Sequence, residues 1–183
     1  MIKNIYKHFK LITEHKMLVL KLCTKAGILY RGIMHDWSKY SPTEFFESVQ
    51  YFTGTHSPIE ECRSINGYSK AWLHHKGRNR HHYEYWIDNN KGKRIPVIIP
   101  FEYSLEMVCD MLAAGMIYKK DSWTKEYPLE YWLDKRNDLE VHPINKKFLT
   151  LIFTLISKHG LNALNYKLTK KLYLKCIKDF FYN

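Results

Sequence analysis

Residues 101–119 have the sequence FEYSLEMVCDMLAAGMIYK, and the spacing of their apolar side chains predicts one long helix. These side chains fall on two sides of the helix, with Leu105, Val108, Cys109, Leu112 and Met116 on one and Met107, Met111 and Ala114 on the other. A helix that is apolar on two sides is typical of the interior of a helical protein. The segment therefore predicts a central, buried helix.

A stripe of carboxylates runs between these apolar faces, because Glu102, Glu106 and Asp110 recur at intervals of four. Buried carboxylates need cations close by. No Lys or Arg occurs between Arg94 and Lys119, so the helix itself does not supply them. The stripe indicates a bound metal ion, histidines from other segments, or ion pairs with lysines elsewhere in the chain.

Helical periodicity extends to both sides of this segment. Further helices are predicted over residues 3–26, 28–36, 42–53, 65–76, 127–136, 143–158 and 161–181. Gly27, Gly77 and Gly160 are expected to end three of them. At the start of the third, Ser41 is the expected cap and Glu44 completes a capping box.

The segments between the helices carry weaker signals. Residues 54–64 are predicted to form a loop and residues 81–90 one or two helical turns. Residues 91–100 are predicted to be extended without a partner strand, because two prolines frame a β-branched run. The expected fold is therefore all-α, with about seven or eight helices.

Length and composition favour one compact domain over residues 1–183, with its site-bearing part at about 10–120 and its C-terminal helices at 127–181. A hydrophobic content of 45% and an aromatic content of 15% exclude a disordered chain. The longest apolar run, Phe148 to Ile156, is too short to cross a bilayer. The first 23 residues lack a signal-peptide core, so we expect a cytoplasmic protein without membrane association.

Net charge indicates the class of partner, and the cysteines indicate whether disulfides or a structural zinc site are expected. Twenty-nine basic and 18 acidic residues give a net charge of +11, which favours a phosphate-containing small molecule, a nucleotide or nucleic acid as partner. The alternative is that the charge only confers solubility. The four cysteines form no C-x-x-C pair, so they favour reduced core residues over a disulfide framework or a zinc knot.

Histidine is the strongest anomaly of composition. The chain has ten histidines, and four of them, His74, His75, His81 and His82, fall within nine residues. His75 shares a predicted helix face with Ala71 and Trp72 and is expected to point inward. The group indicates a metal site, with a solvated basic turn as the alternative.

Two further histidines lie in the N-terminal part. His15 falls in the apolar arc of the first helix, where it is either a satisfied core histidine or a ligand. His35 and Asp36 are adjacent, and their side chains diverge on an ideal helix, so shared ligation requires a helix end or a distortion. Lys39 lies about one helical turn beyond, where an ammonium could hold a phosphate oxygen beside a metal ion.

The order of these residues resembles that of the HD-domain superfamily of metal-dependent phosphohydrolases. Those proteins are all-α and bind a divalent metal ion through an early His, an adjacent His-Asp pair and a late Asp. The residues in that order here are His15, His35, Asp36 and Asp110. Members with extra histidines before the late Asp hold two or three ions, and His75, His81 and His82 lie in that interval.

Two narrower resemblances follow from the motifs. The run His35-Asp36-x-x-Lys39-x-x-Pro42 and the doublet His81-His82 are similar to those of the cyclic-dinucleotide phosphodiesterase branch. The interval between His75 and the doublet is shorter here than in that branch, and the Gly-Tyr-Pro signature of the branch is missing. A closer resemblance, over about residues 10–120, is to a small uncharacterised family of bacteria and phages, which implies no activity. Its patterns are His-Asp-x-Ser-Lys, His-x3-Asn-x-His-His and Glu-Met-Val-x-Asp, which lie here at 35–39, 75–82 and 106–110.

Taken together, the residues and the resemblance predict hydrolysis of a nucleotide or other phosphoester with one or two divalent ions of Mn, Fe, Zn or Mg. The expected ligands are His15, His35, Asp36 and Asp110 for one ion, and His75, His81 and His82 with Asp36 as a bridge for a second. Asp36 and Lys39 are the expected catalytic residues. Lys39, Arg78 and Arg80 are expected to bind the substrate phosphate, and Glu106 and Asn79 to orient the ligands.

Three alternatives stay open at this point. A histidine-rich, carboxylate-bridged di-iron site would suit an HD-like oxygenase. A basic nucleic-acid-binding or phage accessory protein without catalysis would explain the charge, and its affinity for DNA would fall steeply with salt. A purely structural metal ion would stabilise the fold without turnover.

Overall fold

The structure, a computed structural model, describes residues 2–182. Over these residues the chain forms nine α-helices, which confirms the all-α class with one or two helices more than the expected seven or eight. They are α1 (Ile2–Lys25), α2 (Leu29–Met34), α3 (Pro42–Gln50), α4 (Pro58–Asn66), α5 (Lys70–Arg78), α6 (Phe101–Lys119), α7 (Tyr127–Lys135), α8 (Pro143–His159) and α9 (Tyr166–Phe181). Short 3₁₀ helices are η1 (Trp37–Tyr40), η2 (Tyr83–Trp86), η3 (Lys120–Ser122) and η4 (Gly160–Ala163).

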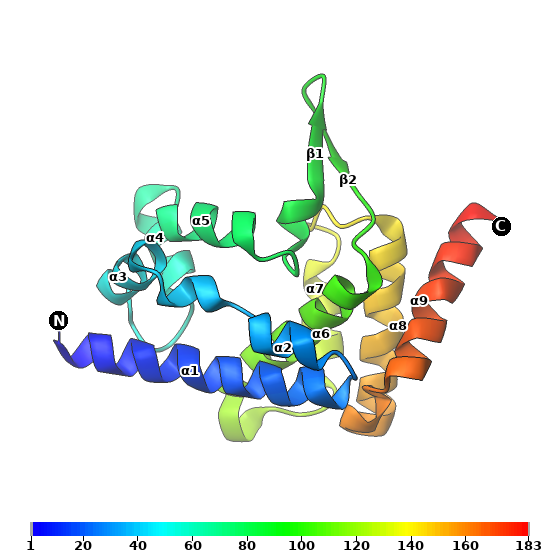
Figure 1. Cartoon of the computed structure of the whole chain (residues 1–183), viewed down its shortest axis with the longest axis horizontal. Helices are drawn as coiled ribbons and strands as arrows, with labels where there is room; N and C mark the ends of the chain where they lie inside the picture. Colours follow the sequence, from blue (N-terminus) through cyan, green and yellow to red (C-terminus); the bar gives the residue numbers. More distant parts are fainter. Residues whose placement is uncertain (1, 183) are drawn as a thin grey trace.

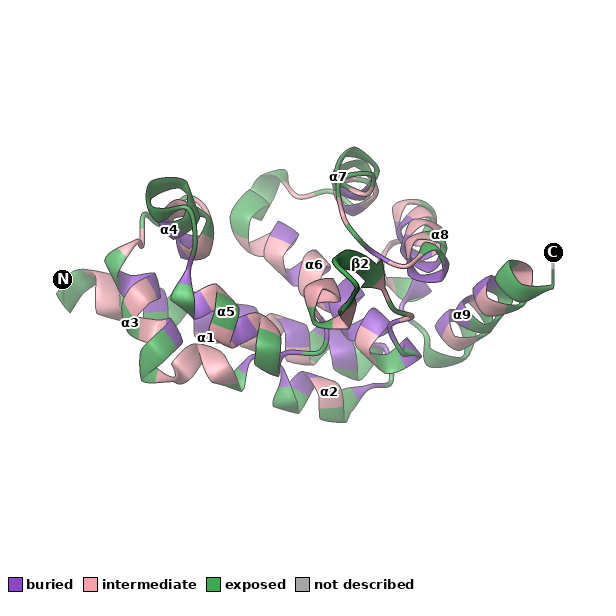
Figure 2. Cartoon of the chain, turned by 90° about the horizontal axis from the view of Figure 1, so that it is seen from above, coloured by how far each residue is buried: buried purple, intermediate pink, exposed green. Residues whose placement is uncertain are grey.

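Helix α6 lies at the centre of the molecule, as its two apolar sides predict (Figure 1). Helices α1 and α2 pack against it, as do α7, α8 and α9. Leu105 and Leu112 of α6 have no exposed surface, and they share one apolar core with Val19 of α1 and Phe148 of α8. Figure 2 shows this arrangement from above, with the chain ends at opposite sides of the molecule.

The segment predicted to form a loop, residues 54–64, contains most of α4, so that prediction is wrong. The helix starts as α3 does, with a proline in its first turn. Residues 57–60 have the same Ser-Pro-x-Glu pattern as residues 41–44. The pattern therefore marks a helix start in both places.

The helix predicted over residues 65–76 is divided between α4 and α5. Helix α5 begins after Ser69, whose side chain accepts a hydrogen bond from the backbone N–H of Trp72. It continues through Gly77 instead of ending there, because the backbone of Gly77 stays outside the left-handed region that helix-ending glycines adopt.

A two-stranded antiparallel sheet joins η2 to α6, formed by β1 (Ile87–Asn90) and β2 (Lys93–Pro96). Of the helical turns expected over residues 81–90, the structure has one, η2, and residues 87–90 are a strand instead. The expectation of an extended run without a partner strand is wrong. The strands meet at Lys91 and Gly92, whose φ angles of 49° and 77° give the tight turn that two-residue hairpins favour. The sequence of β1 is Ile-Asp-Asn-Asn, and Asp and Asn are poor strand formers, so the sequence gives no sign of this strand. The hairpin projects from the helical body (Figure 1).

A buried polar network fixes the start of α6. The Asn145 side chain of α8 accepts a hydrogen bond from the backbone N–H of Ile99 and donates one to its carbonyl oxygen. Tyr173 of α9 donates to the same carbonyl at 2.7 Å. These polar groups are buried, so they cannot form hydrogen bonds with water in place of these contacts. The irregular segment before α6 is therefore held in one place. Glu106 and Asp110 are thereby fixed relative to the other helices.

Close approach of α1 and α2 depends on Gly32. A Cβ atom at Gly32 would lie 2.8 Å from Cys23 Cβ and 3.0 Å from the backbone Cα of Leu20. We expect Gly32→Ala to lower the free energy of unfolding by about 1–3 kcal/mol, as overpacking in a tight core does. Urea denaturation followed by circular dichroism measures this change.

Gly77→Ala is the matched control, because Gly77 lies inside α5 and a Cβ there would meet nothing within 4 Å. Alanine is the better helix former, so this variant should gain about 0.5–1 kcal/mol. Equal stabilities of the two variants would contradict the close packing of α1 against α2.

His8 of α1 is buried against Phe45 and Phe52. Burial, and then the positive charge of Lys39, lowers the pKa of His8 to about 4. Between this pKa and the ordinary value of 6.5, the unfolded chain binds a proton that the folded chain does not. The folded state should therefore lose stability as the pH falls from 6.5 to 4, by as much as about 3 kcal/mol from this group.

His8→Phe keeps an aromatic ring between Phe45 and Phe52 but does not titrate. We expect its free energy of unfolding to fall less between pH 7.5 and pH 4.5 than that of the unaltered chain. Urea titrations at both pH values test this, and parallel losses in the two proteins would remove His8 as a source of the acid sensitivity.

No described helix combines the length and the apolar character that crossing a membrane requires. The four cysteines are buried and unpaired, as expected for reduced core residues.

Candidate metal centre

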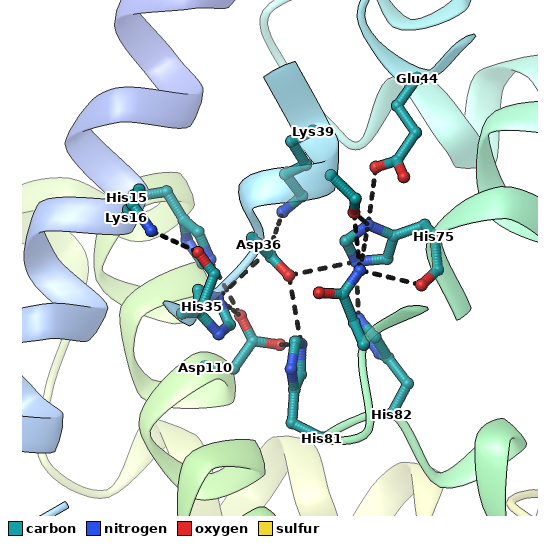
Figure 3. A network of polar contacts seen from close by, with 12 residues as sticks. His15, Lys16, His35, Asp36, Lys39, Glu44, His75, His81, His82 and Asp110 are labelled. Carbon is teal, nitrogen blue, oxygen red and sulfur yellow. Dashed lines mark hydrogen bonds and ion pairs between the residues drawn. The ribbon is translucent and has the colours of Figure 1, made fainter. Parts of the chain in front are cut away.

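Histidines and carboxylates from four parts of the chain meet in one interior region (Figure 3). The contributors are His15 of α1, His35 and Asp36 between α2 and η1, His75 of α5, His81 and His82 between α5 and η2, and Glu106 and Asp110 of α6. All are buried except His82 and Asp110, which are partly exposed. Glu102, the first carboxylate of the expected stripe, is exposed and takes no part.

A change of backbone direction lets His35 and Asp36 face the same region. Helix α2 ends at Met34, and Asp36 has φ 52° and ψ 28°, in the left-handed region that Asp adopts more readily than most residues. Adjacent side chains on a continuous helix point about 100° apart. The helix end and the left-handed residue together are the distortion that shared ligation requires.

The first cluster comprises His15, His35, Asp36 and Asp110, and their four ligand atoms lie within 4.8 Å of one another. Asp110 Oδ1 lies 2.9 Å from His15 Nε2 and 3.4 Å from His35 Nε2. Asp36 Oδ2 lies 3.2 Å from His35 Nε2. Two imidazoles and two carboxylates are a donor set that suits Mn²⁺, Fe²⁺ or Zn²⁺.

The second cluster comprises Asp36, His75, His81 and His82, again with ligand atoms within 4.8 Å of one another. Asp36 Oδ1 lies 3.3 Å from His75 Nε2 and 3.5 Å from His81 Nε2. The Nε2 atoms of His75 and His82 are 2.9 Å apart. Asp36 directs Oδ2 toward the first cluster and Oδ1 toward the second, so its carboxylate belongs to both.

Four of these ligand atoms are buried and make no hydrogen bond within the described part of the chain: His35 Nε2, His81 Nε2 and both carboxylate oxygens of Asp36. Of the four, Asp36 Oδ2 has an ion pair with the ammonium of Lys39, at 2.7 Å. A buried polar atom without a partner costs about 1–3 kcal/mol. Divalent cations held between the two clusters would satisfy all four atoms. The residues therefore fit one or two such ions.

The charges in the clusters also suit cations. Burial raises the pKa values of Asp36 and Asp110, but the neighbouring histidines, together with the Lys39 ammonium beside Asp36, outweigh it and hold both pKa values well below the usual range. Burial lowers the pKa values of His15 and His82, so both imidazoles are neutral at pH 7 and have a lone pair to offer. Burial also acts to lower the pKa of His35, but Asp36 and the other adjacent carboxylates raise it well above its ordinary value. A cation in the first cluster would displace that proton.

Glu106 lies behind the two clusters and contacts a histidine of each. Its Oε1 lies 3.0 Å from His35 Nδ1 and 3.2 Å from His81 Nδ1. Arg31, which sequence reasoning missed, holds the other oxygen with its Nε at 3.1 Å. A carboxylate at Nδ1 fixes the orientation of an imidazole and leaves Nε2 for a metal ion.

Glu44 lies beside His75 as Glu106 lies beside His35 and His81. The sequence had suggested a role for Glu44 in a helix-capping box instead. Its Oε2 lies 2.8 Å from His75 Nδ1, and its Oε1 lies 2.5 Å from His74 Nδ1. Ser41 makes no side-chain capping hydrogen bond, so the expected capping box is wrong. A carboxylate buried in the first turn of α3 turns to the histidines of α5 because burial requires a strong partner.

Asn79 and Lys39 complete the surroundings. Asn79 donates hydrogen bonds to Ser38 Oγ at 2.7 Å and to the His75 carbonyl at 2.9 Å, which ties the end of α5 to η1. Lys39 Nζ lies 2.7 Å from Asp36 Oδ2, and 27% of its side chain is exposed. Lys39 is therefore the cation beside the shared carboxylate that also reaches solvent.

Arg78 and Arg80 line a separate pocket of about 200 Å³. Arg31, Tyr103, His81 and Glu106 also line it. Lys39 does not line it, and neither do the proposed metal ligands other than His81. The structure therefore places the two arginines behind His81 and Glu106 and not beside Asp36.

The comparisons with known proteins concern the region that holds these clusters. The model of a family of unknown function, DUF5662, matches residues 4–155. The chain belongs to this family. The part that matches the DUF5662 model contains all the residues of both clusters, whereas α9 lies outside it. No curated protein and no solved structure matched this DUF5662 chain.

Proposed function

We propose that the protein is a metal-dependent phosphohydrolase that acts on a nucleotide or another phosphoester. The observation that carries the proposal is the buried carboxylate of Asp36, which belongs to two four-residue sets of possible ligands. Its Oδ1 has no hydrogen bond among the described residues, and its Oδ2 has only the ammonium of Lys39 at 2.7 Å. The order of these ligands along the chain resembles that of HD-domain phosphohydrolases, which supports the same reaction class.

Divalent cations bound in such a site lower the pKa of water to about 7 and neutralise charge on a phosphoryl group. The protein's own residues have distinct parts in the proposed reaction. His15, His35 and Asp110 would hold one ion and His75, His81 and His82 the other, with Asp36 shared. Glu106 and Glu44 keep the imidazoles oriented.

Lys39 is the residue we assign to the substrate. Its ammonium lies beside Asp36 and is partly exposed, so it can donate a hydrogen bond to a phosphoryl oxygen that approaches from solvent. The positive net charge of the chain would attract such an anion.

Elemental analysis of the purified protein tests the metal centre. We expect one or two equivalents of a divalent transition metal ion or Mg²⁺ per chain, lost in the double variant His35→Gln/Asp36→Asn. His56→Gln is the matched control, because His56 pairs with Glu61 outside both clusters and should keep the metal content unchanged. Equal metal content in all three proteins would overturn the proposal.

Hydrolysis of bis(p-nitrophenyl) phosphate, with each candidate ion added, tests the reaction. Activity should follow metal content across the variants. A metal-loaded protein that hydrolyses no phosphoester, but whose iron form changes its visible absorption with oxidation state, would replace the hydrolase by an oxygenase that uses the same ligands.

A further inference from the structure

The pocket lined by Arg31, Arg78 and Arg80 has the chemistry of an anion site. It holds three guanidinium groups and one carboxylate, that of Glu106, so its formal charge is 3 − 1 = +2. Glu106 is already engaged by Arg31 and by the ring nitrogens of His35 and His81. The remaining positive charge therefore has no acidic partner among the described residues that line the pocket.

Two of the three guanidinium groups, those of Arg31 and Arg80, lie against aromatic rings. The guanidinium of Arg31 lies 4.5 Å from the ring centre of Tyr103. Arg80 donates a hydrogen bond to the Tyr103 hydroxyl at 3.3 Å, and its guanidinium lies 5.5 Å from the ring of Tyr85. Stacking on a ring leaves the in-plane N–H groups of an arginine free for an oxyanion. Arg78 has only a long contact, 3.4 Å, with the carbonyl of His74.

The size of the pocket indicates a small anionic group. Its volume of about 200 Å³ is less than the roughly 300–1,000 Å³ of pockets that bury drug-sized ligands. Arginine forks match the tetrahedral oxygens of a phosphoryl group. The dimensions thus suit a phosphoryl group and not a complete nucleotide.

The pocket and the metal centre lie on opposite sides of the same two residues. Glu106 faces the clusters with Oε1, and its Oε2 meets Arg31 on the pocket side. His81 directs Nε2 toward Asp36 and Nδ1 toward Glu106. An anion among the arginines therefore lies behind the ligands, where the metal-facing oxygens of Asp36 do not reach it.

We propose that the Arg31–Arg78–Arg80 pocket is a second binding site, which takes the phosphoryl group of a phosphorylated ligand independently of the metal centre. This goes beyond the proposed function and does not require it. The site would hold the phosphoryl group of a phosphorylated effector, without any bond being made or broken there.

Inorganic phosphate is the probe, titrated calorimetrically into the purified protein at constant ionic strength. The variant Arg78→Gln/Arg80→Gln should weaken binding about 100-fold, since each of the two lost charge-assisted contacts is worth about a factor of ten. Both side chains are exposed, so the variant should fold. The control Lys93→Gln/Arg94→Gln removes the same charge from the exposed hairpin and should bind phosphate normally.

A metal-site variant separates this pocket from the proposed active site. Asp110→Asn removes a ligand of the first cluster without touching the pocket lining, and it should keep its phosphate affinity whatever its metal content. Phosphate should also shift the indole N–H resonance of Trp86, which donates to the carbonyl of Arg80 at 2.7 Å.

Two outcomes would overturn the inference. One is phosphate binding that Asp110→Asn abolishes and Arg78→Gln/Arg80→Gln leaves intact, because the anion would then bind only at the metal centre. The other is an equal loss in the arginine variant and in the hairpin control, which would indicate a general effect of charge. Metal content is measured separately in each sample, so failure of the hydrolase proposal remains distinguishable.

Discussion

Glu106→Gln is expected to weaken metal binding in both clusters, by about 10–100-fold, although Glu106 belongs to neither four-residue cluster. One oxygen of Glu106 meets a ring nitrogen from each cluster, and the other meets Arg31. The substitution removes the charge that these three groups share. It also leaves the guanidinium of Arg31 facing an amide, so the variant should unfold at lower urea concentration.

Glu44→Gln is the matched comparison, because Glu44 contacts only His75 among the ligands. We expect it to weaken the second cluster alone and to leave the first ion bound. Metal content after dialysis against graded chelator concentrations measures both effects. Retention of both ions by Glu106→Gln, or loss of both by Glu44→Gln, would contradict the assigned geometry.

Lys39→Met is expected to lower the turnover of a phosphodiester by about 10²–10³-fold, the usual effect of removing one preorganised donor from a developing charge. The metal content should not fall, since Lys39 provides no ligand atom and its ammonium competes with a cation for Asp36 Oδ2. The combination of full metal loading and low activity distinguishes this role from a structural one.

Steady-state hydrolysis and elemental analysis of the same preparations test this prediction. Lys70→Met is a suitable control, because Lys70 is exposed at the start of α5 and belongs to neither cluster. A Lys39→Met variant with normal turnover would remove Lys39 from the proposed active site. A variant that loses its metal ions would make Lys39 a structural residue.

Much of the helical fold is predictable because apolar periodicity is strong where a helix is buried. The pattern over residues 101–119 gives the bounds of α6 without error. The predictions fail where an element is short and polar, as in α4 and in the hairpin, because it has too few apolar side chains to show a helical or strand periodicity. The Lys91-Gly92 turn needs two positive φ angles, and lysine in the first position gives no clear sign of this.

The residue types of the site were predictable, but its supporting residues were predictable only in part: Glu106 and Asn79 were expected to orient the ligands, and Glu44 and Arg31 were not. Histidines and aspartates on inward faces indicate a common interior, and the structure brings His15, His35, Asp36 and Asp110 together. The roles of Glu44 and Arg31 depend on contacts between elements that lie far apart in the chain. Local spacing suggested a helix cap for Glu44, because a carboxylate three residues after a serine has the same pattern whether it serves the backbone or a distant imidazole.

The left-handed backbone of Asp36 limits which substitutions there can be interpreted. Asparagine tolerates that conformation and has the size of aspartate, so it removes the charge and one acceptor oxygen without disturbing the backbone. Glycine would relax the turn while removing the side chain, and alanine would strain it. An alanine scan across this position would thus combine a conformational defect with a chemical one, and only the amide variant separates them.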